Sequence, residues 1–426
     1  MEKAIHNQMG QAALATVLAG MFISLSVGIG ISTIAFLNIQ RLQNITQRIQ
    51  SYYAAEAGIE DALLRVMNSD YNYQTNTSNT LTVGSNSAST TIFLSGNNLI
   101  IRTDGFRQTA TRSIQVSLAV SEGGTSFSYG AQVGEGGVLM ENNSFIEGNL
   151  YSNGGVVLAG LAEIFGDVFV AGSNTLSTAK VLADAHAHTI QNSTVGGDAY
   201  YQTILNSTVA GTSYPGSEDP ELFPLPISQT QIDEWKAEAA AGGTISGNYN
   251  LSGNDTASLG PKKINGDLNI QNTAILTVTG TIWVTGNVNL KNSGAVELAA
   301  SYGNRSGVMV VDGVVTIENS FSLCGSERFN GNECNSSNGR SYLLMLSTNA
   351  GDPAIQMKGT ANLNGILYAA SGTLAVENIA FIKEGTAYRL HLKNNAVVSY
   401  ETGLINLNFS EGPGAGWDIQ SWKEVN

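Results

Sequence analysis

The sequence predicts a mainly β protein with a long N-terminal transmembrane α-helix, a small α+β head and a C-terminal right-handed β-solenoid. Three observations lead to this fold class: a charge-free run over residues 10–38, alternating polar and apolar residues up to residue 120, and a glycine-containing motif that recurs after residue 147. The expected boundaries are a leader at 1–10, the helix at 11–67, the head at 68–122 and the solenoid at 123–426. A proline-rich loop and a short helix are expected to interrupt the solenoid at 212–243.

The charge-free run spans 29 residues, from Gly10 to Asn38. About 20 apolar residues suffice to cross a bilayer. An ordinary signal peptide has a shorter apolar stretch, of about 7–15 residues, and is cleaved after it. Here the plausible processing site, between Gly10 and Gln11, precedes the apolar run. Cleavage at this site would keep the hydrophobic helix in the mature protein, whereas a plain uncleaved anchor is the alternative.

The helix is expected to continue beyond the membrane as an amphipathic one. No proline precedes Pro215, so residues 11–67 can form one helix of about 85 Å at 1.5 Å per residue. Apolar residues at three- and four-residue steps predict a single stripe along it. The stripe consists of Leu42, Ile45, Ile49, Tyr52, Ala55, Ile59, Leu63 and Val66.

A small antiparallel sheet is expected after a polar linker at 68–80. The runs 91–94 and 98–102 flank Ser95-Gly96-Asn97, which is a hairpin signal. Residues 114–120 then alternate strictly between apolar and polar, as half-buried strands do. The preceding helix is expected to cover this sheet.

From residue 123 the chain is repetitive. Glycine followed by Asp or Asn recurs at positions such as Gly148-Asn149, Gly166-Asp167 and Gly266-Asp267, with spacings near 20 residues. Asn-Ser, Asn-Asn or Asn-Thr pairs separate the short apolar runs. A period of this length predicts stacked coils, because each coil buries its apolar side chains against the next. An antiparallel sandwich remains the alternative fold.

One segment interrupts the repeat. Four of the seven prolines lie within residues 215–226. A short helix should follow, because Ser228 and Gln231 form a capping box and Gly242-Gly243 provides a stop. Ile232, Trp235 and Ala239 give this helix one apolar side, which we expect to cover the flank of the solenoid.

The N-terminal segment resembles type IV prepilins, and PilX-type minor pilins and pseudopilins in particular. The similarity rests on Gly10-Gln11-Ala12-Ala13-Leu14, the apolar span and the segment from Tyr53 to Glu60, within residues 1–67. It implies a pilin-like head, cleavage after Gly10 by a prepilin peptidase, methylation of Gln11 and assembly contacts at Glu56 and Glu60. Major pilins carry glutamate where this chain has Ala15, and that departure indicates a minor or tip subunit. The solenoid repeats resemble those of bactofilin-like, polymer-forming proteins.

Composition excludes some partners. The net charge of −14 with only 20 basic residues argues against binding to nucleic acid. The chain has two cysteines, Cys324 and Cys334, and in an exported protein such a pair indicates one disulfide.

No catalytic motif stands out, and we expect neither an enzyme nor a cofactor. His186 and His188 would share one face of a strand, as metal ligands sometimes do. No third ligand is apparent, so surface or coil-stacking histidines are the favoured interpretation, and no metal site is expected.

These features predict a non-enzymatic, structural or adhesive minor subunit of a type IV pilus or pseudopilus. It would be a single-pass membrane protein whose bulk lies at the cell surface, in contact with other pilin-like subunits and with a surface glycan or a partner cell. One alternative is a membrane-anchored β-helix that binds glycans or acts on polysaccharides. Another is a scaffold that polymerises by end-to-end stacking of solenoids.

Overall fold

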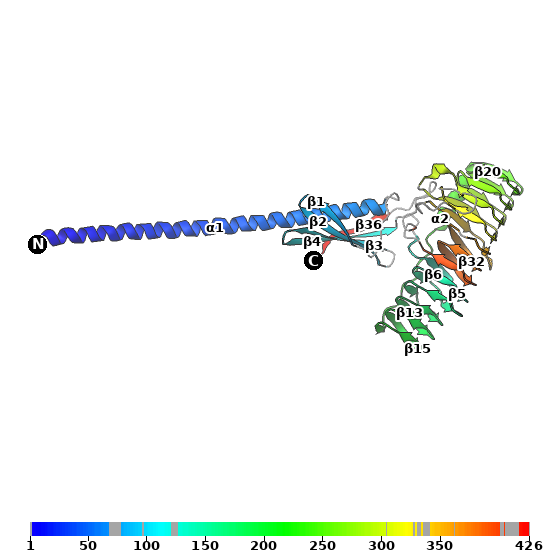
Figure 1. The fold of residues 1–426 in the computed structure, drawn as a ribbon, viewed down its shortest axis with the longest axis horizontal. Coiled ribbons are helices and arrows are strands. Elements are labelled where there is room, and N and C mark those ends of the chain that lie inside the picture. Colours follow the sequence, from blue (N-terminus) through cyan, green and yellow to red (C-terminus); the bar gives the residue numbers. More distant parts are fainter. Residues whose placement is uncertain are drawn as a thin grey trace.

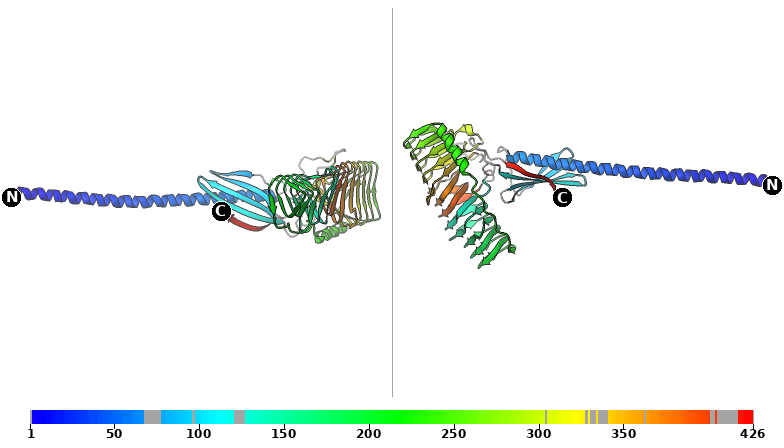
Figure 2. Two further views of the ribbon diagram at one scale, coloured as in Figure 1. Left: turned by 90° about the horizontal axis from the view of Figure 1, so that it is seen from below. Right: turned by 180° about the vertical axis from the view of Figure 1, so that it is seen from behind.

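The computed structural model describes residues 2–67, 78–95, 98–120, 127–303, 305–326, 329, 334, 341–361, 363–400, 404 and 417–425. Of these, the side chains of residues 2–12, 67, 94, 119, 120, 417 and 418 are not described. The protein is mostly β with a long N-terminal apolar helix (Figure 1). The helix projects from a small head, and a larger domain of parallel strands lies at the opposite end of the molecule (Figure 2).

The head is an antiparallel sheet covered on one face by the end of the helix α1 (Glu2–Met67). The sheet order is β1-β2-β3-β4-β36. Its strands are β1 (Ser78–Val83), β2 (Asn86–Ser95), β3 (Asn98–Arg107), β4 (Ala110–Val120) and β36 (Trp417–Val425). The expected hairpin is confirmed, since Ser95 pairs with Asn98, although residues 96–97 themselves lie outside the described part. Most of the expected linker also lies outside it, and β1 already begins at Ser78.

The apolar stripe on α1 is only partly buried. Ala55, Ile59 and Val66 are buried against the sheet, together with Ile114, Val116 and Leu118 of β4. Leu42, Ile45 and Ile49 are exposed. The difference arises because the sheet covers only the last turns of the helix.

The end of the chain corrects the expected boundary of the solenoid. Residues 417–425 form β36, which pairs antiparallel with β4 and completes the head sheet. The expectation that the solenoid extends to residue 426 is therefore wrong: Trp422 lies on β36, in the head, and is 40% exposed. All parallel strands are thus inserted between two neighbouring strands of the head.

The parallel β domain, residues 127–400, consists of three ladders of parallel strands. The first ladder contains β7 (Leu150–Ser152), β10 (Val168–Val170), β17 (Ser213–Pro215), β18 (Thr244–Ser246), β21 (Lys262–Asn265), β24 (Ile282–Val284), β27 (Gly307–Val311) and β30 (Leu343–Ser347). The second contains β8 (Val156–Leu158), β11 (Thr175–Ser177), β19 (Tyr249–Leu251), β22 (Leu268–Ile270), β25 (Val288–Lys291), β28 (Val315–Glu318) and β31 (Ile355–Lys358).

Longer strands bend and take part in both of these ladders. They are β5 (Ala131–Glu141), β13 (Ala185–Gln191), β15 (Ala199–Leu205), β32 (Gly365–Glu377) and β34 (Glu384–Lys393). The third ladder comprises a seven-stranded and a four-stranded sheet. Its strands are β6 (Phe145–Glu147), β9 (Glu163–Ile164), β12 (Lys180–Val181), β14 (Thr194–Val195), β16 (Thr208–Val209), β33 (Phe381–Ile382), β35 (Val397–Ser399), β20 (Thr256–Leu259), β23 (Ile275–Val278), β26 (Ala295–Leu298) and β29 (Ser322–Cys324).

The coils do not stack in chain order. The first strand, β5, pairs in parallel with the last long strand, β34, so the two ends of the domain meet within the stack. A first arm (127–215) runs from this seam to one end of the stack, and a second arm (244–400) runs back to the seam from the other end. Figure 1 places β15 and β20 at opposite ends.

The Gly-Asp/Asn repeat has a direct structural cause. In successive coils the Asx side chain accepts a hydrogen bond from the backbone N–H of the corresponding residue in the next coil. Asn149 Oδ1 accepts from Asp167 N at 2.9 Å, and Asp184 Oδ1 accepts from Asp198 N at 2.7 Å. A Cβ on Gly166 would lie 2.5 Å from Asn149 Oδ1. Glycine therefore precedes Asx because the preceding coil's side chain occupies that space.

The recurrent asparagines lie at a corner of the coils. They adopt the left-handed conformation that asparagine tolerates better than most residues. Their side chains bond to one another, as Asn292 Nδ2 does to Asn272 Oδ1 at 3.1 Å. The same bond crosses the seam, where Asn142 Nδ2 donates to Asn394 Oδ1 at 2.5 Å. The left-handed asparagines are Asn142, Asn192, Asn206, Asn272, Asn292, Asn319, Asn378, Asn394 and Asn395.

The interruption at residues 216–243, here called the strap, connects the far ends of the two arms. It includes α2 (Gln229–Ala241), which begins with the expected capping box of Ser228 and Gln231 and ends at Gly242. Ile232, Trp235 and Ala239 are buried, which confirms the expected apolar side of the helix.

The strap lies along one column of outward-facing residues of the first ladder. Tyr151 donates a hydrogen bond to the Glu221 carbonyl, and Gln132 Nε2 donates to the Pro224 carbonyl at 3.0 Å. Much of the column is apolar or aromatic because the strap, rather than solvent, covers this part of the sheet. Its members are Thr244, Lys263, Trp283, Val310, Leu346, Tyr368, Thr386, Gln132, Tyr151, Phe169, His186, Tyr200 and Tyr214.

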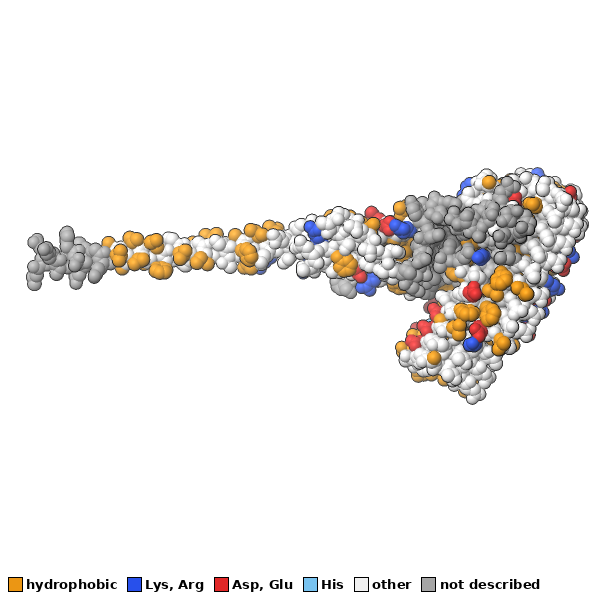
Figure 3. All heavy atoms as spheres, viewed as in Figure 1, with side chains coloured by type: hydrophobic (Ala, Val, Ile, Leu, Met, Phe, Trp, Pro, Cys, Tyr) orange, Lys and Arg blue, Asp and Glu red, His pale blue; other side chains and the backbone are white. Residues whose placement is uncertain are grey.

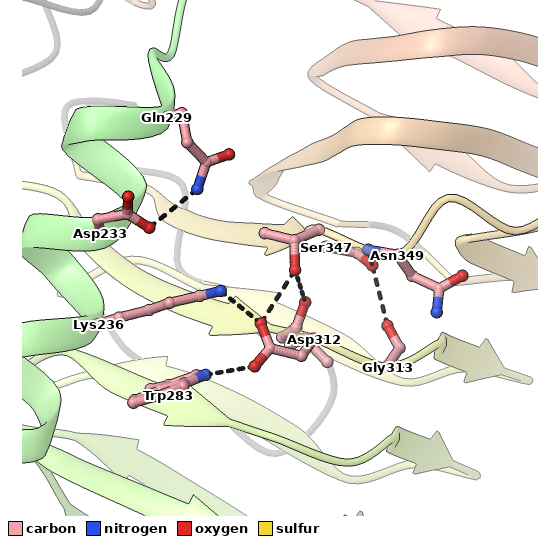
Figure 4. Close-up of polar contacts among 10 residues, drawn as sticks. Gln229, Asp233, Lys236, Trp283, Asp312, Gly313, Ser347 and Asn349 are labelled. Atoms are coloured by element: carbon pink, nitrogen blue, oxygen red, sulfur yellow. Dashed lines mark hydrogen bonds and ion pairs between the residues drawn. The ribbon is translucent and has the colours of Figure 1, made fainter.

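An ion pair fixes α2 to the second arm. Lys236 Nζ lies 2.6 Å from Asp312 Oδ1, and Trp283 Nε1 donates to Asp312 Oδ2 at 2.8 Å (Figure 4). Burial raises the pKa of Asp312, but hydrogen bonds from Lys236, Trp283 and Thr348 outweigh it and hold this pKa below its usual value. The carboxylate therefore stays charged and holds the helix on the sheet.

Glu384, the first residue of β34, is a buried acid beside the seam. Its side chain is fully buried, Oε1 accepts a hydrogen bond from Thr386, and Oε2 has no hydrogen-bond partner among the described residues. Burial raises the pKa of Glu384 well above its usual value. The folded protein therefore holds this carboxyl in its neutral form.

Replacing Glu384 with Gln should make stability less sensitive to pH. Below the ordinary carboxyl pKa of about 4.3 the group is protonated in both states, so it imposes no penalty. As pH rises above that value the unfolded chain ionises first, and wild-type stability falls until the folded pKa is reached. The melting temperature of E384Q should therefore rise relative to wild type between about pH 5 and pH 8. Glu147→Gln, at an exposed site on β6, is the control; an equal pH response in wild type and E384Q would contradict this account.

Candidate assembly surface

The N-terminal part of α1 is an exposed apolar surface. Within Ala13–Val66 the most apolar window has a mean hydropathy of 2.1, and none of it is buried. Large apolar side chains are exposed along this part of the helix, and Figure 3 shows them on the face in view. By length and composition, this one helix of the described chain is able to cross a membrane.

The other end of α1 lies unusually close to the head sheet. A Cβ on Gly58 would lie 2.6 Å from Thr103 Cγ2, and one on Gly105 of β3 would overlap the Ser51 carbonyl oxygen. Beneath Gly58 the hydroxyl groups of Thr90 and Thr103 are hydrogen-bonded at 2.8 Å. The alanine- and glycine-rich segment around residues 54–58 is therefore a packing surface that lets the helix backbone approach the sheet.

Gly105 is a site residue that the sequence analysis did not identify. Its signal was present, because an isolated glycine inside a strand pattern often marks close approach of another backbone. The partner could not be named from the pattern, since the pattern does not say which helix residue lies opposite.

The residues expected to make assembly contacts lie on the same part of α1. Glu56 is half-buried and Glu60 is exposed, so Glu60 is accessible to another subunit. Asp61, next to Glu60, forms an ion pair with Arg65, and its Oδ2 lies 2.8 Å from Arg65 Nε. Such i,i+4 pairs are typical of a solvated helix face. An assembly role for Glu56 and Glu60 stays a prediction.

The processing site Gly10-Gln11 lies within the backbone of α1, and its side chains lie outside the described part. The expected disulfide between Cys324 and Cys334 is present. It closes a loop beside the second arm, where the Glu297 carboxylate accepts a hydrogen bond from the Phe329 N–H at 2.8 Å.

The two histidines contribute to packing. The His186 ring is stacked between Phe169 and Tyr200, with centroid distances of 4.7 and 4.2 Å. Burial lowers the pKa of His186 despite the opposing charges of Asp167 and Asp184. His188 Nδ1 lies 2.8 Å from Asp219 Oδ2 of the strap.

No group of three His, Cys, Asp or Glu residues capable of holding an ion occurs in the described ranges. The arrangement agrees with the expected coil-stacking role of the histidines.

Among solved structures, the competence-associated pilin ComZ from Thermus thermophilus is similar, with 12% sequence identity over 89% of this chain and 98% of that chain and a TM-score of 0.27. A TM-score this low carries no argument about fold or function. No protein-family model and no curated protein matches the chain. The long N-terminal apolar helix is itself consistent with a type IV pilin-like protein.

The close packing of α1 on the head sheet can be tested with two Gly→Ala substitutions on this helix. Gly58→Ala should destabilise the protein by about 1–3 kcal/mol, because its methyl group has no room against Thr90 and Thr103. Gly20→Ala meets nothing within 4 Å and should be neutral or slightly stabilising. Thermal unfolding of the full chain in detergent measures both. Equal effects of the two substitutions would show that close packing at Gly58 is unimportant.

Proposed function

We propose that the protein is a non-enzymatic minor subunit of a type IV pilus or pseudopilus that carries a right-handed β-solenoid outside the cell. The observation that carries the proposal is the division of α1 into two parts. Its first part is apolar and exposed, whereas its last turns pack on an antiparallel sheet through small residues. A helix divided in this way anchors the head in the membrane. The helix and the head can then move together from the membrane into a helical assembly.

The proposed location is the membrane before assembly and the cell surface afterward. Other pilin-like subunits are the expected partners, with α1 and Glu60 on the contacting surface. Ala15, in place of an acidic residue, supports a minor or tip position rather than the bulk of a filament. The disulfide between Cys324 and Cys334 is compatible with export.

The parallel ladders support the solenoid assignment. Asx side chains bond from one coil to the next in both arms, as at Asp267 and Asn287, whose contact is 2.7 Å. The chain leaves the head at the end of β4 and returns to it at the start of β36. These two ends are paired neighbours, since Val120 pairs with Trp417. The insertion therefore adds a bulky domain without altering the pairing of the head sheet. Such a domain suits a contact role at a surface or filament end, toward a surface glycan or a partner cell.

Mass spectrometry of the mature N-terminus tests this proposal. Cleavage by a prepilin peptidase should leave Gln11 as a methylated terminus, and Gly10→Val should abolish this cleavage. Gly20→Val, a similar change within the apolar span, should leave processing intact. A mature chain that begins at Met1, or one cut after Asn38, would contradict the pilin assignment and favour a plain anchor or a secreted protein.

A further inference from the structure

The seven-stranded sheet of the third ladder carries an exposed apolar patch. Its outward row reads Phe381, Val397, Phe145, Glu163 and Lys180 across five neighbouring strands. The patch, defined as Leu161, Phe165, Leu182, Ile379 and Phe381, is between 40% and 70% exposed at each residue. Figure 3 shows apolar side chains gathered on this part of the parallel β domain, with charged groups among them.

In the first ladder, outward-facing apolar residues are covered by another part of the chain. There the strap covers much of the outward column, and Tyr368 and Leu346 are fully buried beneath it. The patch has the same chemistry, yet its residues stay exposed and no described segment of the chain covers them. Contiguous exposed apolar surface on a charge-poor domain is typical of an interaction site.

The charges around the patch indicate which partner fits. Lys180 Nζ and Glu163 Oε1 form an ion pair in the row itself. The row Phe381, Val397, Phe145, Glu163 and Lys180 is therefore neutral, whereas the whole chain carries −14. Two copies of a chain with a high negative charge repel each other, so they can approach closely only through surfaces that carry no net charge.

We propose that the patch is a two-fold docking surface for a second copy of this chain. In an isologous contact the same surface is used by both partners, so opposite charges side by side on it can exchange partners. Lys180 of each chain would face Glu163 of the other, between the rings of Phe165 and Phe381. The contact would be sheet on sheet, at the usual separation of about 10 Å.

The size of the surface predicts a weak dimer. Seven strands spaced about 4.8 Å apart, with two or three residues each, give a face of about 29 by 10 Å. This is well below the roughly 800 Å² per partner of a standard stable interface. Association should therefore be reversible, and it becomes significant where the membrane or a filament concentrates the chains.

The test measures association of the full chain in detergent by sedimentation across a concentration series. Wild type should show a concentration-dependent dimer. The double substitution Phe165→Ser and Phe381→Ser should raise the dissociation constant at least about tenfold. Leu205→Ser, at an equally exposed apolar residue on β15, is the matched control and should leave it unchanged. Thermal unfolding verifies that each variant is folded.

Charge reversal separates two-fold docking from association through α1. K180E and E163K should each weaken self-association, because like charges then face one another across the axis. An equimolar mixture of the two should recover a heterodimer, since each reversed charge meets its complement. A monomeric wild type, or self-association unaffected by these substitutions and by mixing, would overturn the proposal. If the wild-type chain is monomeric but the patch substitutions still prevent its incorporation into pili, the partner is a different subunit. That result would also overturn the proposal.

Discussion

The parallel pairing of β5 with β34 is the contact on which the rest of the architecture depends. It joins residues about 250 apart in the chain, from the pair Gly385 and Ala131 to the pair Lys393 and Glu141, with one register shift between Ala387 and Arg389. Because this seam places both ends of the parallel β domain side by side, the domain can be inserted between β4 and β36 without separating them. Without the seam, the two arms would be connected only through the strap, which joins the two ends of the stack.

The strap follows from the same constraint. Once the first arm has grown away from the seam, the chain must return along the whole stack to begin the second arm. The outward column of the first ladder provides the surface for this return, with hydrogen bonds at Gln132 and Tyr151 and the ion pair of Lys236 with Asp312. The conspicuous prolines suit an extended segment that bonds to side chains of the sheet rather than to a neighbouring strand.

Local structure was more predictable from sequence than stacking order. The apolar span, the hairpin at Ser95, the capping box of Ser228 and the Gly-Asx repeat each follow from short-range rules, and the structure agrees with them. Stacking order does not follow, because every coil offers the same apolar interior and the same Asx acceptor to its neighbours. The role of β36 was missed for a related reason: the segment at Trp422 is short and carries no signal of its own, so nothing in it indicates pairing with β4, about 300 residues earlier. At the candidate assembly surface, small residues signalled the approach of α1 but not its partner strand.

A cross-link across the seam tests this account most directly. Cysteines in place of Asn142 and Asn394, whose side chains are hydrogen-bonded at 2.5 Å, should be joined within one chain by a short thiol-reactive cross-linker in the full-length protein. The native disulfide leaves no other free thiol to compete. Coils stacked in chain order would instead place these two positions at opposite ends of the domain. Peptide mapping that finds the 142–394 link in monomeric protein would support the seam, and its absence from folded protein would contradict it.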